Sequence, residues 1–136
     1  MGILFSIHEP SEMATVSKFE DLDCWKTARQ LVKLVYHLSE SGKLAKDFTT
    51  KDQIRRAALS SMNNIAEGFG RHSKKEFIRF LDISQSSAIE VKSITYVIED
   101  LGYISSEDLL LLRTKVEDTK NLTRGLIKYL RSQLNP

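Results

Sequence analysis

The fold of this chain is decided by residues 73–102, which read SKKEFIRFLDISQSSAIEVKSITYVIEDLG. Apolar residues recur in this stretch every three or four positions, which is the period of an α-helix. They form two stripes, one of Phe77, Leu81, Ser84, Ala88, Val91 and Ile98 and another of Phe80, Ile83, Ser87, Ile94 and Val97. A helix that is apolar on two sides packs against neighbours on two sides. The stretch therefore predicts the central helix of a bundle.

Both ends of this helix carry recognisable signals. Ser73 followed three residues later by Glu76 matches a capping box, in which the two residues satisfy free backbone N–H groups at a helix start. Gly102 is expected to stop the helix, because glycine readily adopts the left-handed conformation found after helix ends. Gly68 and Gly70 are expected to end the preceding helix for the same reason.

Three further helices are expected at about residues 21–40, 50–67 and 105–133, from the helical spacing of apolar residues and from capping and helix-ending residues. Asp21 can cap the first of them, Gly42 is its expected stop, and a weaker cap of Ser105 with Asp108 opens the last. No segment shows the sustained alternation of a strand. Short connections between long amphipathic helices imply antiparallel neighbours. The predicted fold class is all-α, an antiparallel up-down four-helix bundle.

The composition fits one folded domain, since 41% of the 136 residues are hydrophobic and 28% are charged. We expect residues 19–134 to form the bundle and residues 1–18 to form a disordered N-terminal tail. The single cysteine, Cys24, excludes an intramolecular disulfide and fits a reducing compartment, so a cytoplasmic location is expected. The longest apolar run, residues 109–112, is far too short to span a membrane.

No motif for catalysis, metal binding or a cofactor is present in the sequence. The three histidines are scattered, there is no His/Cys spacing of a metal site, and no glycine-rich phosphate loop occurs. No nucleophile with an adjacent base is visible. We therefore expect no enzymatic activity and no cofactor.

One polar stripe lies beside the apolar face of the second helix. Glu90 is a similar case, because it interrupts the second apolar stripe of the third helix. The expected polar cluster is Arg56, Ser60, Asn64, Glu67 and Glu90. An unpaired buried charge is very costly. Glu90 is therefore expected to form a buried or half-buried ion pair with Arg56 or Arg55. The structural interpretation is internal pairing that sets helix register, and the functional alternative is a binding or reactive pocket.

Positive charge is concentrated in one region. Residues 43–79 carry nine Lys/Arg against four Asp/Glu, whereas the rest of the chain carries eleven against fourteen. The candidate nucleic-acid-binding residues are Arg71, Lys74, Lys75 and Arg79, with Lys51 and Arg55 extending the patch. Cations at a helix start oppose the helix dipole, and a phosphate-binding surface would explain their placement. A merely solvated helix start and loop is the alternative, and these observations weigh equally for both. No aromatic residue interleaves with these cations in a way that predicts base stacking, so the expected contacts are to phosphate.

Residues 53–71, QIRRAALSSMNNIAEGFGR, followed by residues 73–81, SKKEFIRFL, closely resemble the bacterial four helix bundle protein family, also called ribosomal RNA intervening-sequence proteins. The resemblance extends over about residues 19–134, with Ser61 and Ser86 departing from the residues usual in the family. It implies an antiparallel four-helix bundle that assembles into a homo-oligomer, typically a pentameric ring. Similar bundles accompany diversity-generating retroelements and bind nucleic acid and a reverse transcriptase through basic surfaces.

The functional hypothesis is a non-enzymatic, homo-oligomeric module that associates with RNA or DNA and with a protein such as a reverse transcriptase. One alternative is a purely structural scaffold for protein partners. Another is an enzyme with a cryptic pocket around Arg56, Asn64 and Glu67. Neither a membrane partner nor a cofactor is expected.

Overall fold

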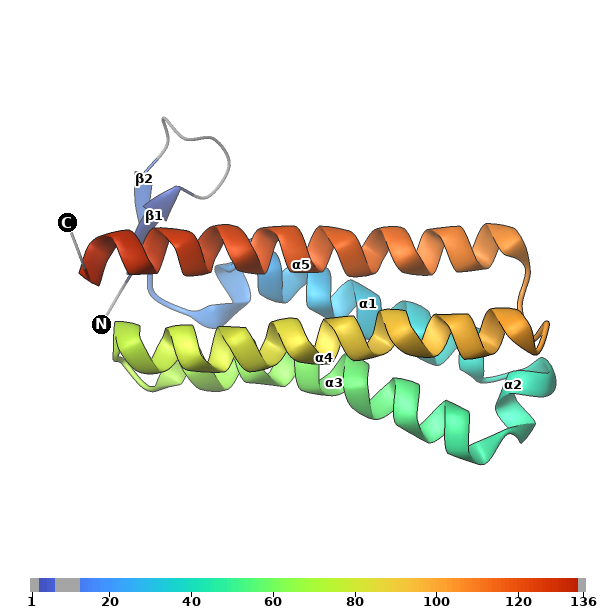
Figure 1. Cartoon of the computed structure of the whole chain (residues 1–136). Helices are drawn as coiled ribbons and strands as arrows, with labels where there is room; N and C mark the ends of the chain where they lie inside the picture. Colours follow the sequence, from blue (N-terminus) through green and yellow to red (C-terminus); the bar gives the residue numbers. More distant parts are fainter. Residues whose placement is uncertain (1–2, 7–12, 135–136) are drawn as a thin grey trace.

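The computed structural model of the chain describes residues 3–6 and 13–134, with side chains from Val16 onward. Four long helices lie side by side as a helical bundle (Figure 1), and the all-helical class is confirmed for the main body of the chain. The elements are β1 (Ile3–Ser6), β2 (Met13–Val16), the 3-10 helix η1 (Phe19–Asp21), α1 (Asp23–Ser39), α2 (Gly42–Lys46), α3 (Phe48–Gly70), α4 (Lys74–Asp100) and α5 (Ser106–Leu134). Each long helix contacts two others, so that α1, α3, α4 and α5 surround one core.

The N-terminal segment, which was expected to be a disordered tail, contains a short antiparallel hairpin of β1 and β2. Ile3 pairs with Val16 and Ser6 pairs with Met13. Val16 is buried among residues of α1, α3, α4 and α5. The apolar side chain of Val16, at the end of β2, therefore packs into the bundle.

Side-chain caps mark the starts of α3 and α4. Asp47 opens α3, two residues earlier than expected, because its carboxylate accepts hydrogen bonds from Thr50 N at 3.1 Å and Thr50 Oγ1 at 2.9 Å. Ser73 caps α4 as predicted, accepting from Glu76 N at 3.2 Å. The Glu76 side chain does not complete the box, because its carboxylate pairs with Arg79.

Two expectations about helix ends were wrong. Asp21 does not cap α1, because it lies inside η1 and Leu22 occupies the cap position. Gly42 does not stop α1 but is the first residue of α2, with a left-handed φ of 69°. Gly102, by contrast, follows α4 with a φ of 67°, in the left-handed conformation predicted for a helix stop.

Gly68 does not end its helix as expected but lies within α3, where it allows a close approach to α4. A methyl group placed on Gly68 would lie 2.6 Å from Phe80 Cβ and 2.9 Å from Phe77 Cδ1. The left-handed residue of the α3–α4 turn is instead His72, with a φ of 57°. Glycine at position 68 is thus required by packing between helices rather than by backbone conformation.

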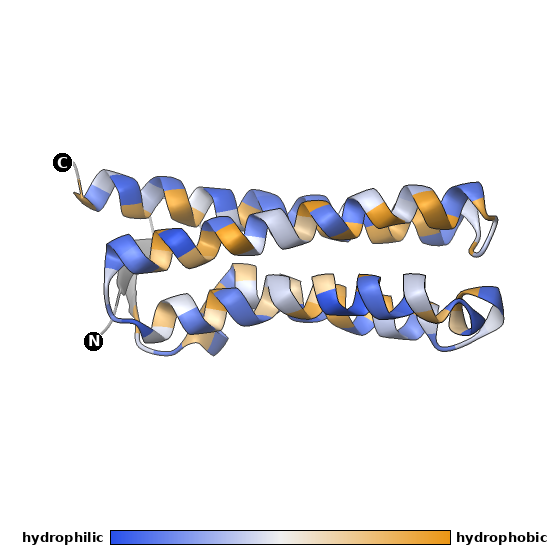
Figure 2. Cartoon of the chain, turned by 60° about the horizontal axis from the view of Figure 1, so that its bottom comes forward, coloured by the Kyte–Doolittle hydropathy of each residue, from blue (hydrophilic) through white to orange (hydrophobic). Residues whose placement is uncertain are grey.

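The core consists of two apolar clusters, one toward each end of the bundle. Buried hydroxyl residues lie between them along three helices: Ser61 on α3, Ser84 on α4, and Thr119 and Thr123 on α5. Ser84 Oγ donates to the Ser61 carbonyl oxygen at 2.7 Å, and each threonine donates to its own helix backbone. The Ser61 hydroxyl oxygen lies 3.4 Å from that of Ser84, so the serine at position 61 has a hydroxyl partner across the core. Hydrophilic and hydrophobic segments alternate along each long helix (Figure 2), as amphipathic helices require.

No helix in the described part of the chain combines the length and apolar character needed to cross a membrane.

Candidate nucleic-acid interface

The turn between α3 and α4 gathers the cations that the sequence singled out. Only Arg71, His72 and Ser73 separate the two helices, so Arg71 lies next to the first turns of α4. We call the set Arg71, Lys74, Lys75 and Arg79 the α3–α4 corner, and all four side chains are exposed. The structure thus brings together the four residues that the sequence placed at the centre of the basic patch.

Phe80 orders two of these cations. The guanidinium carbon of Arg71 lies 5.0 Å from the centre of the Phe80 ring, and that of Arg79 lies 4.7 Å from it. Phe80 is only 7% exposed, because Gly68 lets α3 pack directly against it. A neutral ring attracts a cation by its quadrupole without cancelling its charge. Phe80 therefore orients two guanidinium groups without neutralising their charge.

Phe80 was assigned from sequence to an apolar stripe and not to the candidate site. Its position directly after Arg79 was a weak signal, but the contact with Arg71 depends on the α3–α4 turn. Phe80 contacts two of the cations, which the sequence did not reveal, but the expectation that no aromatic residue offers them a base-stacking platform is not contradicted. The ring is covered by Arg71 and Arg79, so it serves as a support for cations rather than as an open stacking surface.

The acidic residue within the corner is Glu76. Its carboxylate accepts a hydrogen bond from Arg79 Nε at 3.0 Å. This bond, together with the nearby charges of Arg79, Arg71 and Lys75, lowers the pKa of Glu76 below its ordinary value. Lys74 Nζ donates to Gln133 Oε1 of α5 at 3.5 Å. Lys75 forms no ion pair with any described residue, so the corner keeps a net positive charge.

Lys51 and Arg55 do not extend the corner. They lie near the opposite end of α3, and the twenty residues from Lys51 to Arg71 correspond to about 30 Å of helix axis. Lys51 Nζ lies 4.8 Å from the Phe48 ring centre. Arg55 lies 4.3 Å from the Tyr36 ring centre and donates from Nε to Ser39 Oγ at 2.7 Å. Lys51 and Arg55 belong to the same basic stretch of sequence as the corner, but a long helix places residues at its two ends far apart in space.

The predicted ion pair of Glu90 with an arginine of α3 is absent from the described residues. Glu90 accepts a hydrogen bond from Gln53 Nε2. Arg55 turns toward α1, where Ser39 binds it, and Arg56 is exposed without an ion pair in the described chain. Because Glu90 stays partly exposed, the neutral amide of Gln53 can satisfy it without a second charge.

Part of the expected polar cluster does form between α3 and α4. Asn64 Nδ2 donates to the Ser60 carbonyl oxygen at 2.8 Å and to Ser60 Oγ at 3.0 Å. The Ser60 and Ser87 hydroxyl oxygens lie 2.8 Å apart. From the sequence, Ser87 was expected in an apolar stripe and not in this cluster. Glu67 is exposed and does not take part in these hydrogen bonds. The arrangement fits internal pairing that sets the register of the two helices.

Cys24 is unsuited to act as a nucleophile. Burial raises the pKa of its thiol to about 12, so the reactive thiolate is scarce at neutral pH. Within the described ranges, no three His, Cys, Asp or Glu side chains are grouped so that they could hold a metal ion.

Comparisons with known proteins agree with the resemblance seen in the sequence. A family described as 23S rRNA-intervening sequence protein matches residues 20–125. A crystal structure of a protein of unknown function from the S23 ribosomal protein family of Bacteroides thetaiotaomicron is similar, with a TM-score of 0.70 and 23% sequence identity. The similarity covers 77% of this chain and 95% of that protein, and it establishes a shared fold. No functionally curated protein matches the chain.

Proposed function

Because this chain belongs to the 23S rRNA-intervening sequence protein family, we propose that it is a non-enzymatic module that binds RNA through the α3–α4 corner. Its scaffold is an antiparallel up-down four-helix bundle, and its working form is a cytoplasmic homo-oligomer, with a pentamer implied by the family resemblance. The observation that carries the proposal is the placement of Arg71 and Arg79 over the ring of Phe80. Preordered, exposed guanidinium groups are well suited to bind phosphate oxygens.

The chemistry of the corner favours contacts to the nucleic-acid backbone over contacts to bases. Its charged groups are two guanidiniums and two ammoniums, and Phe80 is covered by the guanidiniums. Backbone contacts carry little sequence information, so the binding is weakly sequence-specific and falls steeply with salt. Repetition of the corner around an oligomer strengthens a weak single contact by avidity.

The test is a titration of structured RNA and duplex DNA at two salt concentrations. In the test variant, Arg71, Lys74, Lys75 and Arg79 are changed to alanine. A matched control changes four exposed lysines elsewhere, Lys26, Lys33, Lys43 and Lys46, and removes the same charge. We expect the corner variant to lose affinity and much of its salt dependence while the control retains both. No binding by the wild type at low salt, or equal binding by the corner variant, contradicts the proposal.

A second candidate function, a scaffold for protein partners, is favoured by one observation on α4. Ile83, Val97 and Leu101 are 38%, 46% and 50% exposed and recur at helical spacing on one side of α4. An apolar row of this kind suits an interface between copies of the chain or with another protein. Light scattering that gives a monomer at micromolar concentration contradicts self-association, whereas a wild type that assembles but does not bind RNA favours the scaffold.

A further inference from the structure

A second row of cations lies on the C-terminal half of α5. Residues 119–134 contain no Asp or Glu, and their four cations are Lys120, Arg124, Lys128 and Arg131. Successive spacings of four, four and three residues place these cations on one side of the helix, and we call them the α5 row. From the first to the last the row covers about 17 Å of helix axis.

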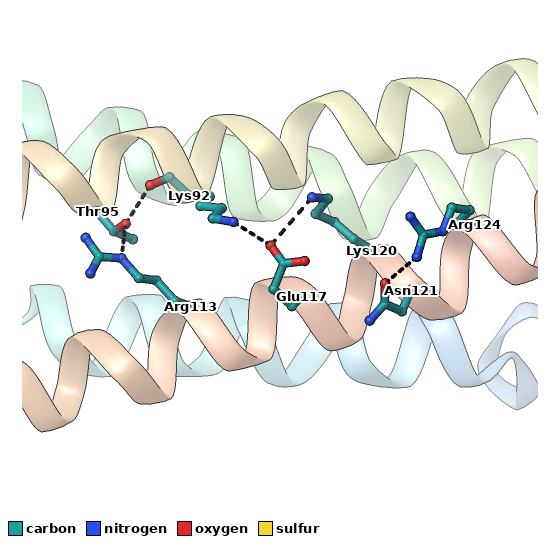
Figure 3. A network of polar contacts seen from close by, with 7 residues as sticks. All are labelled: Lys92, Thr95, Arg113, Glu117, Lys120, Asn121 and Arg124. Carbon is teal, nitrogen blue, oxygen red and sulfur yellow. Dashed lines mark hydrogen bonds and ion pairs between the residues drawn. The ribbon is translucent and has the colours of Figure 1, made fainter.

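The row is only partly neutralised by its surroundings. Arg131 Nη2 lies 3.6 Å from Asp82 Oδ2 in a largely exposed pair. Lys120 Nζ lies 3.5 Å from Glu117 Oε1, and Lys92 binds the same oxygen at 2.8 Å, as Figure 3 shows. Two lysines therefore share one carboxylate, which leaves the group cationic.

The middle of the row has no acidic partner. Arg124 donates from Nη2 to Asn121 Oδ1 at 2.8 Å, and the amide carries no charge (Figure 3). Lys128 is exposed and forms no ion pair with a described residue. Arg124 and Lys128 are therefore the two members of the row whose charge is most available to an anion.

The last member of the α5 row, Arg131, lies near the α3–α4 corner. Lys74 Nζ of the corner donates to Gln133 Oε1, two residues beyond Arg131. Asp82 lies less than one helical turn beyond Arg79 on α4 and pairs with Arg131. The two groups of cations are therefore neighbours across α4 and α5 and form one band.

Gly125 leaves bare backbone beside the row. It lies inside α5, its φ is not left-handed, and a methyl group placed on it would meet nothing within 4 Å. Neither a turn nor packing against the residues whose side chains the structure describes explains a glycine there, and glycine weakens a helix interior. It does allow another molecule to approach the backbone closely between Asn121 and Arg124 on one side and Lys128 on the other.

We propose that the α5 row is a track for the phosphate backbone of double-stranded RNA that is already held at the α3–α4 corner. This inference rests on the proposed function and names the form of RNA. A straight helix with evenly spaced charges suits a rigid, regularly charged double helix. Unpaired RNA is bound largely by stacking of bases on aromatic side chains. The aromatic residue of α5, Tyr129, is half-buried against the core.

The experiment measures binding of a short RNA duplex by fluorescence anisotropy over a salt series. The α5 variant carries Arg124→Ala and Lys128→Ala, and its matched control carries Lys43→Ala and Lys46→Ala on α2 at the other end of the bundle. Both remove two exposed lysine or arginine charges from helix surfaces. We expect the α5 variant to lose affinity and to shift the slope of log affinity against log salt by about two, at roughly 0.9 per phosphate contact. The control should keep the wild-type slope.

The outcomes separate this inference from the proposed function. If the wild type binds RNA and depends on the corner, but the α5 variant matches its control, the track is wrong and the proposed function stands. If the wild type does not bind, or the corner variant binds normally, the proposed function itself fails. Equal loss for single-stranded RNA of the same length overturns the choice of a duplex. A loss seen with polyglutamate and not with RNA assigns the row to an acidic protein.

Discussion

The α3–α4 corner and the C-terminal half of α5 both present four cations, but different features of the structure hold these cations in place. At the corner, two guanidiniums lie over the buried ring of Phe80, and Phe80 is held by the close contact with Gly68. On α5 the cations are spaced along one helix surface around Gly125, whose surroundings are open. Glycine serves tight packing in the first region and leaves bare backbone in the second.

This contrast teaches that equal charge in two regions does not imply equal sensitivity to mutation. The arrangement of the corner depends on how α3 and α4 fit together, so a change in packing should disturb its cations. The α5 row depends on helical spacing alone, so the same kind of change should leave it in place. Substitutions at the two glycines test this difference directly.

The largest effect is expected for Gly68→Ala. The new methyl group would lie 2.6 Å from Phe80 Cβ, which has little freedom to move because it is attached directly to the α4 backbone. The two helices must separate locally, and overpacking of this kind typically lowers the free energy of unfolding by about 1–3 kcal/mol. Chemical denaturation measures the change. RNA binding should weaken as well, because Phe80 moves away from Arg71 and Arg79.

Gly70→Ala is the control for this prediction. Gly70 is also in α3, but a methyl group on it would meet nothing within 4 Å. It should therefore leave stability and RNA binding close to those of the wild type. Equal effects of the two substitutions would show that the loss comes from helix conformation and not from the α3–α4 contact.

A smaller effect of opposite sign is expected for Gly125→Ala. Open space surrounds the new methyl group, so the substitution should raise the free energy of unfolding by about 0.5–1 kcal/mol through the better helix propensity of alanine. Thermal unfolding followed by circular dichroism measures it. A destabilised variant would mean that another copy of the chain packs against this face of α5, which contradicts an open RNA track.

The smallest effect is expected from the titration of Glu76. Arg79 and the neighbouring cations lower the pKa of this carboxyl in the folded protein. A carboxyl with a lowered folded-state pKa stabilises the fold at pH values above its unfolded pKa, and that contribution is lost as the pH falls through the folded pKa. Because Glu76 is exposed to solvent, the loss should be small.

Comparison of the wild type with Glu76→Gln between neutral pH and pH 3 isolates this contribution. The stability difference between the two proteins should narrow as the pH falls, since protonation removes from the wild type the charge that the variant lacks. The variant should also bind RNA more tightly at neutral pH, because Arg79 is released from its carboxylate. If the difference in stability between the two proteins stays constant with pH, the charge of Glu76 is not its cause.

Much of the fold followed from local rules. The amphipathic period predicted the four long helices, and Ser73 and Gly102 marked the limits of α4 because a hydroxyl cap and a left-handed glycine act within a few residues. The errors arose where several local signals competed. Asp21 is a good cap by composition, but the chain forms η1 there, and Gly42 opens α2 instead of simply ending α1.

The candidate site was predictable in its charges and not in its contacts. Arg71, Lys74, Lys75 and Arg79 lie close together in sequence, so a short turn was enough to gather them. The pairing of Glu90 with Gln53 depends on the register of α3 against α4, and the sequence alone could not choose between Gln53 and a nearby arginine. The α5 row was hidden because the acidic residues elsewhere outside 43–79, including four in the first half of the same helix, outweighed its charge in the sum.

The sequence by itself determined that the chain is helical, where its long helices lie and where positive charge is concentrated, because period, caps and charge are properties of neighbouring residues. The tertiary structure decided which of these charges lie close together. The corner lies far from Lys51 and Arg55 because α3 is long and holds its two ends apart. The α5 row lies next to the corner because α4 and α5 pack side by side. Gly68 acquired its role in the same way, since a close approach between helices exists only once the two helices have met.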